Sequence, residues 1–102
     1  MTKNEVLIAI RQLIRKHGIM AVRRATHAMR YQHWEDNDAH SFQELLDRMS
    51  WEGLKGFKKA SIGYIAEWVY HDIQGNYPEE TERQSALQEF RESVKEAKNY
   101  GR

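Results

Sequence analysis

Apolar residues recur along most of this chain at the three- and four-residue spacing of an α-helix, and no segment alternates like a half-buried strand. In the first segment, for example, Val6, Ile10 and Leu13 fall on one helical face. The chain has 102 residues, of which 40% are hydrophobic, and this is enough for one domain with its own core. We therefore predict a single all-α domain over residues 1–102, a compact bundle of about five helices.

Capping and stop signals indicate where these helices begin and end. Thr2 and Glu5 have the spacing of a capping box, and Gly18 is expected to end the first helix in the left-handed conformation. Ser41 opens a short third helix by the same capping pattern, and Gly75 is expected to end the fourth. The predicted helices are 2–17, 19–34, a short helix from 41, roughly 57–74, and 78 to near 99.

The last two predicted helices differ in how much of their circumference is apolar. The fourth is apolar over most of it, which is typical of a helix enclosed by others, so we expect it at the centre of the fold. Its inward residues are Ile62, Ile65, Ala66, Val69 and Ile73. The fifth has only a narrow stripe of Leu87, Phe90, Val94 and Ala97. We interpret it as a peripheral brace, with a homodimer through this C-terminal helix as the alternative.

Several functional classes are excluded by composition and motifs. The absence of cysteine excludes a disulfide scaffold, a cysteine-ligated metal site and thiol catalysis. No apolar run approaches the roughly 18–20 residues that cross a bilayer, and no secretory signal is recognisable, so we expect a cytoplasmic protein. No catalytic motif occurs, and the histidines and acids lack convincing metal-ligand spacing. We expect a protein that acts by binding, with no enzymatic activity, cofactor or metal.

The formal charge of +1 conceals an uneven distribution of charged residues. Residues 1–34 hold seven Lys or Arg and one acid, whereas residues 35–53 hold six acids and one Arg. Residues 54–66 hold three Lys and no acid, and residues 67–102 hold eight acids and five bases. Because local fields decide which surface attracts a polyanion, the first and third blocks are the candidates. The alternative is that basic and acidic blocks fold against each other and cancel.

The second predicted helix is the best functional candidate. Its alanines fall on one face, and basic residues interleaved with aromatic ones fall on the other and its flanks: Arg23, Arg24, His27, Arg30, Tyr31 and Trp34. Guanidinium groups neutralise phosphates and aromatic rings stack on bases, so this face is typical of a nucleic-acid-binding surface. The alternative is a solvated face paired with the acidic block at residues 35–52.

The turn before the fourth predicted helix is the second candidate. It carries Lys55, Lys58 and Lys59 between and after Gly53 and Gly56. Lysines are unfavourable at a helix N-terminus but suit an anion that also contacts the free N–H groups there. We predict phosphate contacts from these lysines, and a plain turn with solubilising lysines is the alternative.

A protein partner is the alternative to nucleic acid. Ile8 projects between Arg11 and Arg15, away from the apolar face of the first helix. Aromatic and arginine residues are enriched at protein-binding hot spots, so Trp34 and Trp51 are further candidates for such contacts. The sequence therefore favours a small nucleic-acid-binding regulator that contacts the phosphate backbone. A binding adaptor or inhibitor that docks on a larger protein complex is the second hypothesis.

Overall fold

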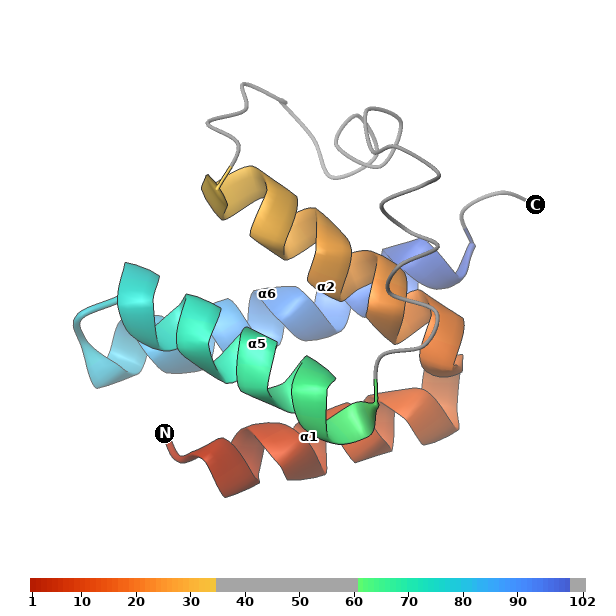
Figure 1. The fold of residues 1–102 in the computed structure, drawn as a ribbon, viewed down its shortest axis with the longest axis horizontal. Helices are drawn as coiled ribbons and strands as arrows, with labels where there is room; N and C mark the ends of the chain where they lie inside the picture. The colour runs from red at the N-terminus through yellow and green to blue at the C-terminus, as the bar shows by residue number, and fades with distance from the viewer. Residues whose placement is uncertain (35–60, 100–102) are drawn as a thin grey trace.

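The computed structural model describes residues 1–34 and 61–99, with side chains described for 1–30 and 61–99. These residues form four α-helices and no strand: α1 (Lys3–His17), α2 (Ile19–Trp34), α5 (Ile62–Asn76) and α6 (Glu80–Lys98) (Figure 1). The all-α prediction is confirmed for this part of the chain, and the short helix predicted from Ser41 lies outside it. None of the described helices is long and apolar enough to cross a membrane.

The junction between α1 and α2 follows the predicted signals with one difference. The Thr2 hydroxyl accepts a hydrogen bond from the Glu5 N–H at 3.2 Å, which caps the start of α1. Gly18 ends α1, and its N–H donates to the Ile14 carbonyl at 2.8 Å. Its φ of 91° and ψ of 155° are not the predicted left-handed helical values but an extended conformation that is almost confined to glycine.

Both predicted ends of the fourth helix, now α5, were wrong. Ser61 has an extended backbone, and its hydroxyl accepts from the Tyr64 N–H at 3.3 Å, so the helix begins at Ile62 rather than at Phe57. Gly75 does not end the helix, because glycine is a stop signal only where its φ turns positive, and that of Gly75 does not. The helix continues to Asn76.

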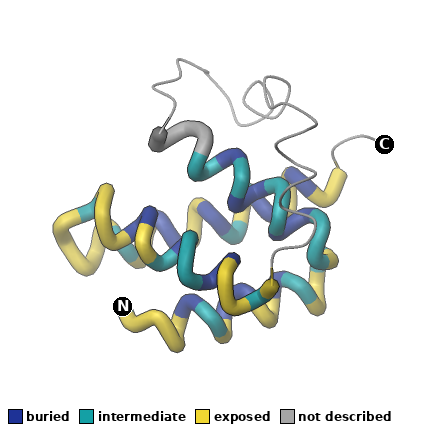
Figure 2. Tube along the Cα trace, in the orientation of Figure 1, coloured by how far each residue is buried: buried dark blue, intermediate teal, exposed yellow. Residues whose placement is uncertain are grey.

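The core lies between all four helices. α2 packs mainly on α6 and α1 mainly on α5, with further contacts between α1 and α2 (Figure 1). Buried positions recur along all four helices (Figure 2). The largest fully buried side chains are Val6, Ile10, Val22, Thr26, Ile65, Val69, Ile73 and Val94. The prediction that α5 is enclosed at the centre of the fold was wrong: Ile65, Val69 and Ile73 are buried on one side, but Tyr64 on another side is 61% exposed.

The narrow stripe of α6 is part of this core. Leu87, Phe90, Val94 and Ala97 are each at most 3% exposed within a single chain. Burying an aliphatic or aromatic side chain of this size stabilises a fold by about 1.5–3 kcal/mol, so α6 contributes more than a peripheral brace would. The apolar stripe is thus buried within a single chain, and its burial does not require a homodimer through α6.

Candidate anion-binding surface

The basic residues predicted on α2 lie against neighbouring helices. Arg24 Nη1 donates to the carbonyl oxygen of Ala97, near the end of α6, at 3.4 Å. The Arg30 guanidinium lies 4.8 Å from the centre of the Trp68 ring on α5, in cation–π geometry. Arg23, Arg24, His27 and Arg30 are all half-buried, and none of them lacks an intramolecular partner. These contacts tie α2 to the bundle, and phosphate binding by this face stays a prediction.

His27 shows the electrostatic consequence of that packing. Burial, and secondarily the positive charge of Arg30, lower the pKa of His27 below its ordinary value of 6.5. The imidazole is therefore mainly neutral at neutral pH and adds little positive charge to the α2 face. On the same side of the bundle, the rings of Tyr64 and Trp68 stack with their centres 6.1 Å apart.

Several other predicted site residues cannot be placed. Lys55, Lys58, Lys59 and Trp51 lie outside the described residues. Tyr31 and Trp34 belong to α2, but their side chains are not among those described. The alternative protein-binding residues on α1 are described: Ile8 is 47% exposed, and Arg11 and Arg15 are exposed beside it.

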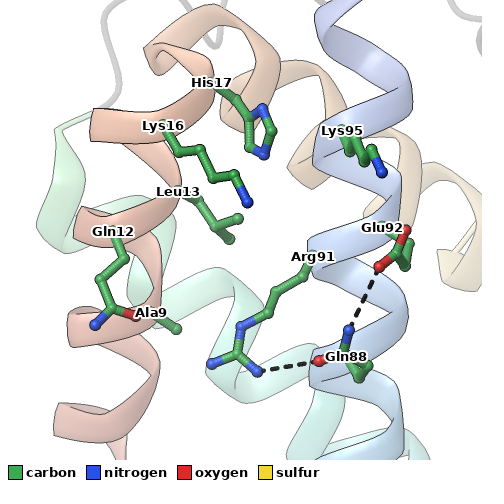
Figure 3. A pocket seen from close by; sticks show the side chains of 9 residues that line it. All are labelled: Ala9, Gln12, Leu13, Lys16, His17, Gln88, Arg91, Glu92 and Lys95. Carbon is green, nitrogen blue, oxygen red and sulfur yellow. Dashed lines mark hydrogen bonds between the residues drawn. The ribbon is translucent and has the colours of Figure 1, made fainter.

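A second basic region, which sequence reasoning missed, lies between α1 and α6. A cavity of about 280 Å³ opens there, with Lys16 and His17 contributed by α1 and Arg91 and Lys95 by α6 (Figure 3). The remaining lining residues are Ala9, Gln12, Leu13, Gln88 and Glu92. Two helices at opposite ends of the sequence thus share one cationic site.

The ends of the two helices explain why these cations converge. α1 has Arg15, Lys16 and His17 in its last turn, and α6 has Lys95 and Lys98 in its last turn. Cations are favoured there by the partial negative charge of a helix C-terminus. Both C-termini lie at the same end of the bundle, at the right of Figure 1. We call the group Lys16, Arg91, Lys95 and Lys98 the cationic surface.

Toward its C-terminus, α6 carries its basic and acidic side chains on different sides. At 100° per residue, Arg91, Lys95 and Lys98 fall within an arc of about 60°, on the side that faces the cavity. Glu82, Glu89 and Glu96 fall within about 40° on roughly the opposite side. Glu80, in the first turn of α6, projects at the angle of Lys98 but lies at the other end of the helix and pairs with Met1 and Arg83. A helix whose segment is acidic on average therefore presents a basic edge to α1.

Within the described residues, no carboxylate forms an ion pair with the cationic surface. In residues 1–30 and 61–99, the ion pairs are Met1–Glu80, Lys3–Glu67 and Arg83–Glu80, and none of them involves a member of this surface. Arg91 Nη1 instead donates to Gln88 Oε1 at 3.4 Å, and Gln88 Nε2 donates to Glu92 Oε1 at the same distance (Figure 3). Within the described ranges, therefore, no carboxylate neutralises the cationic surface.

His17 lies at the upper end of the cavity in Figure 3. Its Nδ1 atom is buried and has no hydrogen-bond partner among the described residues. An unsatisfied buried polar atom costs about 1–3 kcal/mol, so the position is unfavourable for the fold alone. Burial is the largest cause that lowers the pKa of His17 below 6.5, and the charges of Lys98, Lys16 and Lys95 lower it further.

Neither metals nor known relatives offer another explanation of this site. Among the described residues, no group of three or more His, Asp or Glu side chains could hold a metal ion. The chain matches no protein-family model, and comparisons with curated proteins and with solved structures found no significant match. The function is therefore inferred from the site itself.

Proposed function

We propose that this protein is a small, non-enzymatic nucleic-acid-binding regulator whose cationic surface contacts the phosphate backbone. The observation that supports the proposal is that the C-terminal halves of α1 and α6 line one cavity, which brings Lys16, Arg91 and Lys95 to one site. Lysine and arginine side chains without a carboxylate partner are surrounded by mobile counterions. Phosphates that replace those counterions gain affinity through counterion release.

The proposal differs from the sequence prediction in where the main contacts lie. On α2, Arg24 and Arg30 already contact Ala97 and Trp68, so phosphate binding there competes with contacts within the fold. Among the described residues, no carboxylate pairs with Lys95 or Lys98. We therefore expect the cationic surface to contribute more to phosphate affinity than α2 does.

The test is the salt dependence of binding. Fluorescence anisotropy with labelled single- and double-stranded oligonucleotides, from about 50 to 300 mM salt, gives the slope of log affinity against log salt. The double variant K95Q/K98Q should make this slope shallower by about 2, because each lysine that binds a phosphate contributes about 1 to it. The control is Lys3→Gln, which removes one lysine charge at the other end of α1, where Lys3 pairs with Glu67, and should leave the slope unchanged. Salt-independent binding, or no binding by the unmodified protein, would contradict the proposal.

The exposure of Ile8 supports a second candidate function, a protein-binding adaptor. An aliphatic side chain that is 47% exposed between Arg11 and Arg15 has the composition of a small hot spot. Affinity capture from nuclease-treated lysate, compared for the unmodified protein and Ile8→Asp, distinguishes the two functions. A defined partner that is retained after nuclease and lost with Ile8→Asp favours the adaptor. A partner that is lost on nuclease treatment favours nucleic acid.

A further inference from the structure

The cavity between α1 and α6 has donors on both of its walls. In Figure 3, Lys16 and His17 extend from α1 toward α6, and the Arg91 guanidinium extends from α6 toward α1. Lys95 is a further lining residue on α6, one turn beyond Arg91. The cavity is therefore lined by hydrogen-bond donors that come from two helices, and both are anchored in the core by Leu13 and Phe90.

The charge of the lining is complementary to an anion. It contains three permanent cations, Lys16, Arg91 and Lys95, and one carboxylate, Glu92, so its net charge is +2 while His17 is neutral. The Glu92 carboxylate already accepts a hydrogen bond from Gln88. A volume of about 280 Å³ lies just below the range of about 300–1,000 Å³ for small-molecule pockets, so the cavity admits a phosphate group together with part of the molecule that carries it.

We infer that this cavity is a phosphate-binding pocket in which Lys16, Arg91 and Lys95 donate hydrogen bonds and His17 takes up a proton as the phosphate binds. The inference specifies a binding site for the proposed function. It depends on that function only for the identity of the molecule that carries the phosphate. That source is either a phosphate of a nucleic acid or a free phosphorylated small molecule. The chemistry of recognition is the same in both cases, because guanidinium and ammonium groups bind phosphate oxygens by charge-assisted hydrogen bonds.

The groups that face His17 explain the coupled protonation. On α1 and α6 they are Lys16, Arg91, Lys95, Lys98 and the single acid Glu92, and on α2 Arg24 contacts Ala97 next to Lys98. Burial and these cations keep the imidazole neutral in the empty pocket. The negative charge of a bound dianion offsets the charges of the lysines and favours the protonated imidazole, whose buried Nδ1 atom then carries a proton. Phosphate should therefore raise the pKa of His17, and the affinity for an anion whose own charge does not change should increase as the pH falls toward the mildly acidic range.

The first experiment titrates the protein with inorganic phosphate while the ring signals of His17 are followed by NMR. We expect saturable shifts below about 10 mM phosphate and a raised His17 pKa in the bound state. Arg91→Gln and Lys95→Gln should each weaken binding at least about fivefold. Lys3→Gln, the matched loss of one charge outside the pocket, should leave the affinity unchanged. Shifts that do not saturate, or that are equal in Lys95→Gln, would overturn the inference.

A second measurement isolates the role of His17. Sulfate keeps its charge across the pH range in which phosphate itself titrates, so the pH dependence of sulfate affinity reports on the protein. His17→Gln should retain anion binding through the cations but lose the increase in affinity at lower pH. If the increase persists in His17→Gln, the proposed proton uptake is wrong. Circular dichroism shows whether each variant is folded before its affinity is interpreted.

Competition between ligands identifies the source of the phosphate. If an oligonucleotide displaces inorganic phosphate from the pocket, the phosphate is that of a nucleic acid. If phosphate binds saturably and the oligonucleotide does not displace it, the pocket binds a free phosphorylated molecule. The proposed function is then wrong, and the inference of a phosphate-binding pocket still holds. If oligonucleotide affinity depends on salt as expected but the shifts of the His17 signals do not saturate with phosphate, the inference of the pocket is wrong and the proposed function still holds.

Discussion

The two basic regions of this protein use their cations in different ways. On α2, Arg24 and Arg30 turn toward neighbouring helices, where they contact the Ala97 carbonyl and the Trp68 ring. At the ends of α1 and α6, Lys16 and Lys95 have no ion pair with any described residue and face a cavity. A basic segment is therefore a binding surface only where the fold leaves its charges unengaged.

Each described helix contacts the other three, so the difference lies in where the cations stand on their helices. Arg24 and Arg30 of α2 meet Ala97 of α6 and Trp68 of α5. Arginine suits such positions because its planar guanidinium stacks on rings and donates to carbonyls while its stem packs on apolar atoms. The last turns of α1 and α6 lie at one end of the bundle, where lysines such as Lys95 are exposed.

The largest expected effect is on stability, and it compares the buried side of α6 with its exposed basic side. Phe90→Ala should lower the free energy of unfolding by about 3–5 kcal/mol, because it empties a position that is 3% exposed in the core. Lys95→Ala, further along the same helix, should change it by no more than about 0.5 kcal/mol. Urea unfolding measures both. A Lys95→Ala cost similar to that of Phe90→Ala would show that the cationic edge is structural and not a binding surface.

Next in size is the effect of substituting Gly18, which joins the two basic regions in the sequence. Its φ of 91° is one that L-residues rarely adopt, although a Cβ at this position would meet no atom within 4 Å. Gly18→Ala should therefore cost about 1–3 kcal/mol through backbone strain alone. Thermal unfolding of Gly18→Ala beside Gly75→Ala, a helical glycine with equally open surroundings, isolates the strain. Equal costs for the two variants would contradict this explanation.

The fold was largely predictable, because helical periodicity reports directly on which side chains are buried. The positions of Val6, Ile65 and Phe90 in the core follow from that pattern. The cavity was not predictable for a specific reason: charge was summed over residues 67–102, where acids outnumber bases. Summing along the chain hides the separation of charge around a helix, and a helical projection of α6 would have placed Lys98 opposite Glu89. The approach of α1 to α6 is tertiary, and no local pattern contains it.

A smaller effect tests whether the α2 arginines are structural. Arg30→Ala should lower the free energy of unfolding by about 1 kcal/mol, because it removes a half-buried cation–π interaction with Trp68. Arg30→Lys keeps the charge but loses the planar stack and should recover only part of this stability. Chemical unfolding of both variants is the measurement. If Arg30→Ala is as stable as the unmodified protein, Arg30 does not stabilise the fold. The α2 face would then again be the first candidate for the nucleic-acid site.

The smallest expected effect is the pH dependence of stability, and it compares the histidines of the two regions. The pKa values of His17 and His27 are both lowered in the fold from 6.5, with burial as the first cause. As the pH falls below about 6.5, the unfolded chain therefore binds protons before the folded one does, and stability declines until the folded pKa values are passed. Urea unfolding in phosphate-free buffer should show this decline, and His17→Gln and His27→Gln should each reduce it.

Salt distinguishes the two histidines further, because three lysines help to lower the pKa of His17, whereas a single arginine, Arg30, does so for His27. Added sodium chloride screens charge but not burial, so it should raise the pKa of His17 more than that of His27. NMR titration of both ring signals at low and high salt measures the difference. An equal response would mean that the lysines at the ends of α1 and α6 do not act together on His17. The cationic surface would then lack the combined field on which its affinity for phosphate depends.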